Sequence, residues 1–176
     1  TPLLQGNVFL SYFDKTYKRI QDYFKRTGEK ARTTTINDFK IPSVFELLER
    51  VDKKRLCDVP SYAIHGDFIL DNILKTSDGF CLLDWRQDFA GDLKNGDIYY
   101  DLAKLNHNLI FNHRNVNNDC YMLENVDNKV YCDILVNYRL IECKSIFDSF
   151  LKEKFFDIEK VNLLTSIIWL NMAPLH

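Results

Sequence analysis

The chain has 176 residues, of which 46% are hydrophobic and 27% are charged, a composition typical of one globular domain and unlike that of disordered or fibrous proteins. Its 23 Lys and Arg residues against 25 Asp and Glu give a net charge of −2, so there is no overall positive field for nucleic acid or an anionic membrane. We therefore expect a single domain over residues 1–176 with no nucleic-acid partner.

The cysteines and the apolar segments favour a cytoplasmic location. The five cysteines are odd in number and include no Cys-x-x-Cys pair, unlike a secreted disulfide framework. The most apolar segment, residues 161–175, is interrupted by polar residues, so we expect no membrane span.

The first predicted helix starts at about Leu10, where apolar residues recur every three or four positions, and ends at Gly28 after a cationic last turn. Its other face carries four cations, which we interpret as a solvated face in preference to a site for anionic ligands: Lys15, Lys18, Arg19 and Lys25. A polar loop is expected around residues 33–37.

The middle of the chain predicts a second helix, a strand and a hairpin. Ser43 and Glu46 form the spacing of a capping box, which starts a helix that we expect to reach about Arg55. Residues 62–64 favour a short strand, and residues 73–76 and 80–83 flank a Ser-Asp-Gly turn, which predicts a β-hairpin.

The rest of the chain is predicted to be mainly helical. Leucines and an isoleucine at helical spacing predict a helix that starts after Gly96 and Asp97. Residues 112–119 are expected to form a loop, residues 121–132 a second hairpin, and residues 137–151 and 157–171 two closing helices. These elements predict an α+β fold that is mostly helical.

The residues that indicate chemistry lie at the two ends of the first hairpin. His65-Gly66-Asp67 and Asn72 precede it, and Asp84-Trp85 follows it. If the hairpin forms, Asn72 and Asp84 come together, and their oxygens are ligands suited to magnesium. Asp67 could then accept the proton of a hydroxyl beside a metal-bound phosphate.

This pattern resembles the catalytic loop of the protein-kinase-like superfamily, and most closely the aminoglycoside phosphotransferase and choline kinase family, with its H-G-D-x4-N loop and later D-W or D-F. The resemblance implies that Asp67 is the catalytic base, that Asn72 and Asp84 bind magnesium and with it ATP, and that His65 orders the loop. Trp85 would take the place of the aromatic residue after the metal-binding Asp.

The likeness continues through residues 96–103, where we expect Asp97 and Asp101 to cap the helix or fix the loop. Two departures favour a small-molecule alcohol as the acceptor over a protein. Arg86 stands where protein kinases have glycine, and Ile69 stands where they often carry a lysine two residues after the base. The strong motifs cover about 40 residues, from 64 to 105.

A kinase of this type also needs a small N-terminal lobe that covers the ATP phosphates. Glycine occurs only at positions 6, 28, 66, 79, 91 and 96, so no Gly-x-Gly-x-x-Gly loop is present. We therefore expect the chain to be the C-terminal lobe alone, with the N-terminal lobe as its partner in the same polypeptide. Alone, the lobe should fold but fail to transfer phosphate.

Two other functions stay open at this point. The chain could be a catalytically silent lobe that serves as a docking or regulatory surface. It could also be a metal-dependent phosphoesterase that uses His65, Asp67, Asp71 and Asp84 with two metal ions; ATP dependence would distinguish a kinase from this enzyme.

The acceptor is the least defined part of the prediction. Five aspartates against Arg86 and Lys94 give residues 84–101 a local charge of −3. Such a segment could attract an amine or a quaternary ammonium group, in line with choline-like or aminoglycoside-like acceptors. Sugars and other alcohols are also acceptors in the family that the chain resembles.

Overall fold

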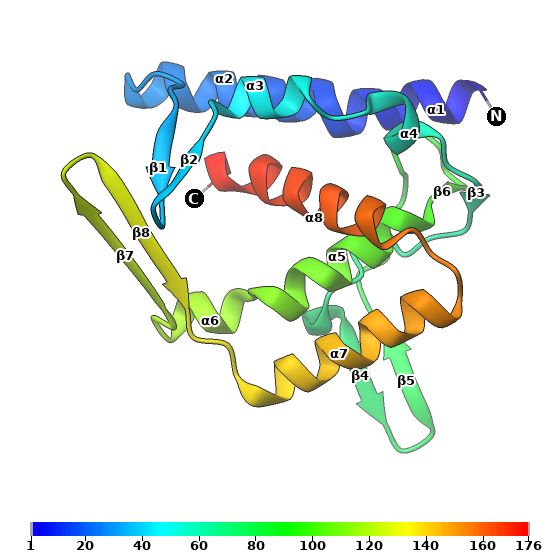
Figure 1. The fold of residues 1–176 in the computed structure, drawn as a ribbon. Helices are drawn as coiled ribbons and strands as arrows, with labels where there is room; N and C mark the ends of the chain where they lie inside the picture. Colours follow the sequence, from blue (N-terminus) through cyan, green and yellow to red (C-terminus); the bar gives the residue numbers. More distant parts are fainter. Residues whose placement is uncertain (1, 176) are drawn as a thin grey trace.

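The computed structural model describes residues 2–175, and its N-terminal helices form one continuous rod (Figure 1). The rod consists of α1 (Pro2–Phe9), a π-helical turn η1 (Leu10–Asp14) and α2 (Lys15–Thr27). Gly28 ends it as predicted, with a left-handed φ of 72° and its N–H 3.0 Å from the Phe24 carbonyl. The helical conformation starts earlier than the predicted Leu10.

The second predicted helix is two helices, α3 (Val44–Glu49) and α4 (Lys53–Cys57). The capping box at its start is confirmed, because the Ser43 N–H donates to Glu46 Oε2 at 2.8 Å and the Glu46 N–H donates to Ser43 Oγ at 3.4 Å. The single helix to Arg55 was wrong, since the Asp52 side chain accepts the Arg55 N–H at 2.9 Å and starts a new helix.

Two hairpins far apart in sequence form one four-stranded sheet, in the order β2-β1-β8-β7. Its strands are β1 (Thr34–Ile36), β2 (Phe39–Ile41), β7 (Tyr121–Val126) and β8 (Lys129–Ile134), and β1 is parallel to β8. The hairpin at 121–132 is confirmed and is longer than predicted. The polar loop at 33–37 was wrong, because β-branched residues there lead into an Asn37-Asp38 turn with positive φ at both positions.

The predicted hairpin near the motif is confirmed as β4 (Ile73–Thr76) and β5 (Gly79–Leu82). Thr76 pairs with Gly79, so the turn has only Ser77 and Asp78 between the strands. A 3-10 turn, η2 (Leu70–Asn72), precedes the hairpin. The strand expected at 62–64 is a two-residue strand, β3 (Ser61–Tyr62), which pairs with β6 (Gly96–Asp97).

The remaining helices are α5 (Ile98–Ile110), α6 (His113–Asn117), α7 (Tyr138–Glu153), α8 (Ile158–Met172) and the short η3 (Ala173–Leu175). The three long helices were predicted. The loop expected at 112–119 contains α6 instead, because Asn112 and Asn115 form a reciprocal cap. In Figure 1, α8 lies between the N-terminal rod and α5, and α7 lies along the opposite side of α5.

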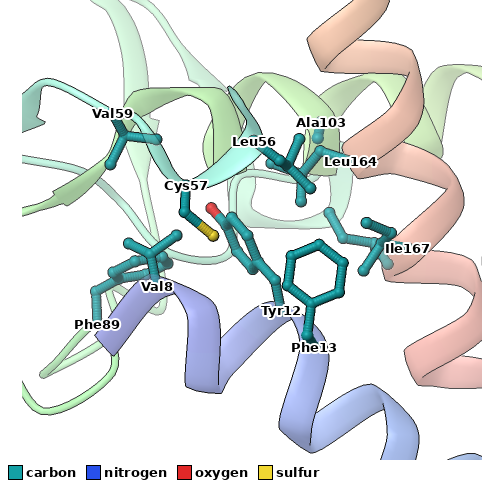
Figure 2. Packing of buried hydrophobic residues seen from close by; sticks show 11 residues of the cluster. Val8, Tyr12, Phe13, Leu56, Cys57, Val59, Phe89, Ala103, Leu164 and Ile167 are labelled. Carbon is teal, nitrogen blue, oxygen red and sulfur yellow. The ribbon is translucent and has the colours of Figure 1, made fainter. Parts of the chain in front are cut away.

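The main core forms where the N-terminal rod, α4, α5 and α8 meet. Figure 2 shows Tyr12 and Phe13 pointing from the rod toward Leu56 of α4 and Leu164 of α8. Phe13 and Leu164 have no exposed surface, and burying side chains of this size contributes roughly 1.5–3 kcal/mol each. A second cluster joins α5 to α7 and α8.

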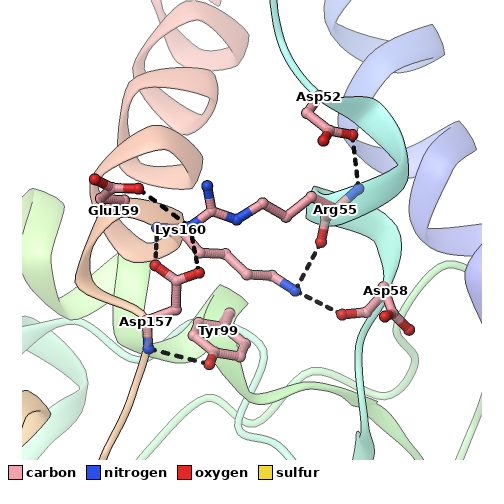
Figure 3. Close-up of polar contacts among 7 residues, drawn as sticks. All are labelled: Asp52, Arg55, Asp58, Tyr99, Asp157, Glu159 and Lys160. Carbon is pink, nitrogen blue, oxygen red and sulfur yellow. Dashed lines mark hydrogen bonds and ion pairs between the residues drawn. The ribbon is translucent and has the colours of Figure 1, made fainter.

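Polar contacts fix α4 against the start of α8 (Figure 3). The buried Lys160 side chain donates to the Asp58 carbonyl at 2.7 Å and lies 4.6 Å from the Tyr99 ring centre. On the surface, Arg55 pairs with Asp157 at 2.6 Å. These contacts hold α4 and the start of α8 together.

The mixture of helices and small sheets confirms the predicted α+β fold class. Within the part of the chain that the structure describes, no helix has the length and apolarity needed to cross a membrane.

Candidate active site

Two backbone hydrogen bonds bring the segments at the two ends of the β4–β5 hairpin together. The Leu83 N–H donates to the Asn72 carbonyl at 2.9 Å, which extends the hairpin pairing to the residue before Asp84. The Arg86 N–H donates to the His65 carbonyl, also at 2.9 Å. The structure thus places residues 65–72 beside residues 83–86, as the sequence pattern predicts.

His65 connects the two segments through its side chain. Its Nε2 lies 2.8 Å from the Leu83 carbonyl oxygen, and its Nδ1 lies 3.2 Å from the backbone N of Asp67. The carbonyl can only accept and the backbone N–H can only donate, so both bonds form when Nε2 carries the proton and Nδ1 accepts. The Trp85 ring lies against it at 4.8 Å between ring centres. Both ring nitrogens are therefore occupied within the protein.

Gly66 allows the loop to approach Arg86 closely. Its φ is +82°, and a Cβ atom at this position would lie 2.7 Å from Arg86 Cβ. The close contact adds a steric requirement for glycine to the conformational one.

We expect Gly66→Ala to lower the free energy of unfolding by about 2–4 kcal/mol, because the substitution combines left-handed strain with a clash against the first carbons of the Arg86 side chain. Gly28→Ala is the matched control, since Gly28 has a similar φ of +72° and open space at its Cβ; it should cost about 1 kcal/mol. Urea unfolding of both variants measures the difference, and equal losses would contradict a role for the Arg86 contact.

One face of α5 holds the loop through three polar side chains, at positions 101, 104 and 108. The Asp101 carboxylate accepts the His65 N–H at 2.6 Å and the Gly66 N–H at 2.8 Å. Asn108 Oδ1 accepts the Leu70 N–H at 2.9 Å. Residues three and seven apart share a helix face, so α5 positions the whole loop. The predicted role of Asp101 in fixing the loop is confirmed.

Asp67 lies between a cation and an amide. The buried Lys104 ammonium lies 2.7 Å from Asp67 Oδ1, and this is the oxygen's one polar partner among the described residues. The Asn72 amide nitrogen lies 2.9 Å from the Asp67 carbonyl and 3.4 Å from its Oδ2. The Asp67 side chain is 24% exposed, which leaves it accessible to a small molecule.

Asp84 has an unusual backbone conformation and an exposed side chain. Its φ of +56° lies in the left-handed region, which costs a non-glycine residue roughly 1–2 kcal/mol. Strained residues of this kind concentrate at functional sites. Asn72 uses its amide nitrogen for both of its side-chain hydrogen bonds among the described residues. Its Oδ1 and the exposed Asp84 carboxylate are therefore two oxygen groups that could bind a cation.

Both groups are oxygen donors of the chemical kind that magnesium binds. Magnesium prefers hard oxygen ligands and commonly takes only one or two from the protein, with phosphate oxygens and water completing its shell. The described residues contain no cluster of three or more His, Cys, Asp or Glu side chains of the kind that holds a metal by protein ligands alone.

A sequence model of the phosphotransferase enzyme family matches residues 9–115, which is more than half of the chain. The chain belongs to the phosphotransferase enzyme family. This result confirms the resemblance drawn from the His65–Asp84 motif, all of which lies inside the matched segment. No curated protein and no solved structure gives a significant match.

The sequence analysis missed two α5 residues that contact the loop, Lys104 and Asn108. Lys104 was not predicted to contact Asp67, although a lysine three residues after Asp101 shares its helix face, which is a signal that could have been used. Asn108 was also missed, and it continues the same helix face.

The other aspartate of the 96–103 segment caps α5, as predicted. Asp97 Oδ1 accepts the Tyr99 N–H at 2.9 Å, and Oδ2 accepts the Tyr12 hydroxyl at 2.7 Å. Burial raises the pKa of Asp97 to about 6. On the far part of α5, burial lowers the pKa of His107 to about 4, and its ring lies 5.6 Å from that of Trp169.

Asp97 and His107 should change the free energy of unfolding in opposite directions as the pH changes. Between pH 4 and 6, folded Asp97 keeps a proton that the unfolded chain releases, so its contribution to stability is lost as pH rises. Folded His107 lacks a proton that the unfolded chain binds below about pH 6.5, so its contribution is lost as pH falls. The two effects should nearly cancel.

We therefore expect Asp97→Asn to lose about 2–3 kcal/mol more stability than the wild type between pH 7 and pH 4. His107→Gln should instead gain stability over the same range, because only the Asp97 contribution is left. Urea unfolding at four pH values measures both profiles. Wild-type pH profiles in both variants would contradict the opposing titrations of Asp97 and His107.

Proposed function

We propose that the chain is the catalytic lobe of a kinase that transfers the γ-phosphoryl group of ATP to a hydroxyl of a small molecule. The observation that carries this proposal is the joining of the Asp67 loop to Asp84 by the Leu83–Asn72 and His65–Leu83 hydrogen bonds. The same local structure contains a candidate base and two candidate magnesium ligands, which are three of the parts that phosphoryl transfer requires.

In this mechanism Asp67 accepts the proton of the acceptor hydroxyl. The acceptor oxygen forms a bond to the γ-phosphorus, the bond from that phosphorus to the β,γ-bridging oxygen breaks, and ADP leaves. Bound magnesium, held by Asn72 and Asp84, would neutralise charge on the ATP phosphates. The Asn72 amide group holds the Asp67 backbone, and α5 holds the loop through Asp101 and Asn108, so catalysis is mainly a matter of positioning.

We also propose that the lobe works with an N-terminal lobe of the same polypeptide. The support is the chemistry of ATP binding, which needs cationic and backbone contacts on the phosphates besides magnesium. The β4–β5 hairpin and the residue after Asp84 present exposed apolar side chains that such a lobe could cover: Leu74, Phe80 and Trp85.

The phosphoesterase alternative receives little support from the geometry. Both ring nitrogens of His65 bond to backbone atoms, so the ring would have to break these bonds to bind a metal ion. Asp71 instead faces His113, with 3.3 Å between carboxylate and ring nitrogen, and both side chains are more than half exposed.

The decisive experiment is an assay of ADP formation by the full-length polypeptide with magnesium, ATP and a panel of hydroxyl compounds. A kinase forms one ADP for each acceptor molecule phosphorylated. Phosphate release from phosphomonoesters without ATP would favour the phosphoesterase. Stable binding of a partner protein with no turnover of any acceptor would favour a silent lobe.

A further inference from the structure

A cavity of about 280 Å³ lies beside Asp67, between the N-terminal rod, α5, α8 and the residue after Trp85. Four cations reach it from three parts of the chain: Lys15 and Arg19 from α2, Arg86 from the loop after β5, and Lys104 from α5. Asp67 is the one carboxylate among the described residues that line it. The cavity is therefore strongly positive in a chain whose net charge is −2.

The cations differ in depth. Lys104 is buried at 8% exposure, Arg19 is half-buried, and Lys15 and Arg86 are exposed. Buried and half-buried cations strengthen the interaction with an anion because solvent screens them less. A ligand in solution can reach the two exposed cations, Lys15 and Arg86.

Contacts with other parts of the protein hold two of these cations, Arg19 and Arg86, in place. The Arg19 guanidinium donates to the Asn171 carbonyl at 2.9 Å. The Arg86 side-chain stem lies against Gly66, and its backbone N–H is bonded to His65. Neither Lys15 nor Arg86 forms an ion pair with any described residue, so both are available to a ligand.

Desolvation and the nearby like charges both disfavour the charged form of Lys15. Although the Lys15 side chain is exposed by surface area, partial desolvation beside the cavity lowers its pKa, and the neighbouring cations Arg19, Arg86 and Lys104 lower it further, while Asp88 raises it. A bound anion would relieve this repulsion. Two of the four cations that the sequence suggested as a solvated face, Lys15 and Arg19, belong to this cavity, whereas Lys18 is exposed and lies outside it.

We propose that this cavity binds the acceptor through a phosphate or carboxylate group carried by the same small molecule as the reacting hydroxyl. The proposal rests on the kinase function proposed above, because Asp67 lines the cavity and would meet the hydroxyl there. Asn72 and Asp84 are not among its lining residues, which places the cavity on the acceptor side of the base and away from the candidate magnesium ligands.

The acidic segment at 84–101, which suggested a cationic acceptor, has a structural explanation. Asp88 accepts the Gly91 N–H at 2.8 Å, and Asp92 accepts the Lys94 N–H at 2.8 Å. Asp97 and Asp101 are buried and bond to backbone groups. Four of the five carboxylates thus stabilise loops and helix ends, and an anionic acceptor fits the cavity better than a choline-like or aminoglycoside-like one.

The volume of the cavity also indicates a small acceptor. It lies just below the roughly 300–1,000 Å³ of pockets that hold drug-sized ligands. A compound with one sugar ring and one anionic group suits this space better than a multi-ring amino sugar.

The test measures binding without nucleotide. NMR titrations of the chain with inorganic phosphate, methyl phosphate and acetate at low salt follow the backbone signals of Lys15 and Arg86. We expect saturable shifts at millimolar concentration for at least one anion, lost at high salt; the methyl phosphate and acetate titrations distinguish a phosphate from a carboxylate. No saturable shift with any of the three anions would overturn the proposal.

Lys15→Gln and Lys18→Gln form a matched pair on one helix. Lys15→Gln should weaken binding of the preferred anion about five- to tenfold, because it removes a charge-assisted contact, and Lys18→Gln should change it less than twofold. Equal effects of the two variants would overturn the proposal. A second result would also overturn the proposal. If the full-length Lys15→Gln protein loses as much affinity for magnesium-ATP as for the anion, then the cations bind the nucleotide phosphates and not the acceptor.

The acceptor assay separates this inference from the proposed kinase function. Preferential phosphorylation of anionic alcohols over their neutral and amino analogues supports both. Efficient transfer to neutral or amino acceptors alone overturns the anionic acceptor and keeps the kinase. Anion binding at Lys15 and Arg86 without ATP-dependent transfer to any alcohol overturns the kinase function, and with it the assignment of the bound anion as an acceptor.

Discussion

Asp67→Asn in the full-length polypeptide should lower turnover by two or more orders of magnitude while it leaves magnesium-ATP binding nearly unchanged. The asparagine amide cannot take up the acceptor proton, and a general base typically contributes about 10²–10⁴ in rate. Nucleotide affinity should persist because the candidate magnesium ligands, Asn72 and Asp84, are retained. Steady-state kinetics and calorimetric titration of magnesium-ATP measure the two quantities.

The substitution also removes the partner of the buried Lys104 ammonium, and an uncompensated buried charge can destabilise a protein by about 3–5 kcal/mol. The double variant Asp67→Asn with Lys104→Gln should recover stability without recovering turnover. Asp71→Asn, on the same loop but paired with the exposed His113, should stay within about threefold of wild type. Wild-type turnover in a folded Asp67→Asn protein would remove Asp67 from the role of base.

The parts of the site that could be predicted are those set by local sequence. A hairpin with short strands returns its two ends to one place whatever surrounds it, so the meeting of Asn72 with the segment before Asp84 followed from spacing alone. Helix caps are equally local, and the capping box of Ser43 and Glu46 formed as expected.

The parts that could not be predicted depend on packing between distant segments. The cationic cavity exists only because α2 and α5 both pack against α8, which places Lys15, Arg86 and Lys104 around one cavity. The parallel pairing of β1 with β8 joins residues 35 and 129, and no periodicity in the sequence marks such a pair. The helical pattern places Lys15 and Lys18 on the same polar face. Only the packing of distant segments puts Lys15 at the cavity and leaves Lys18 outside it.

Substitution of the candidate magnesium ligands should have the second large effect, which is on the binding of magnesium-ATP. Asp84→Ala should weaken productive magnesium-ATP binding more than Asn72→Ala, because a carboxylate neutralises metal charge and an amide does not. We expect half-saturating magnesium to rise about tenfold or more for Asp84→Ala, equivalent to at least about 1.4 kcal/mol, and several-fold for Asn72→Ala.

Backbone strain has to be separated from ligand loss at Asp84, whose φ of +56° is tolerated better by Asp and Asn than by Ala. Asp84→Asn keeps a residue suited to this conformation and removes only the charge, so it should reproduce most of the rise in half-saturating magnesium with little loss of thermal stability. At Asn72, part of the loss should come from the missing bond to the Asp67 carbonyl, which added magnesium does not restore. Activity measured against magnesium concentration distinguishes the two causes, and unchanged half-saturation in Asp84→Asn and Asn72→Ala would exclude a magnesium ion shared by these two residues.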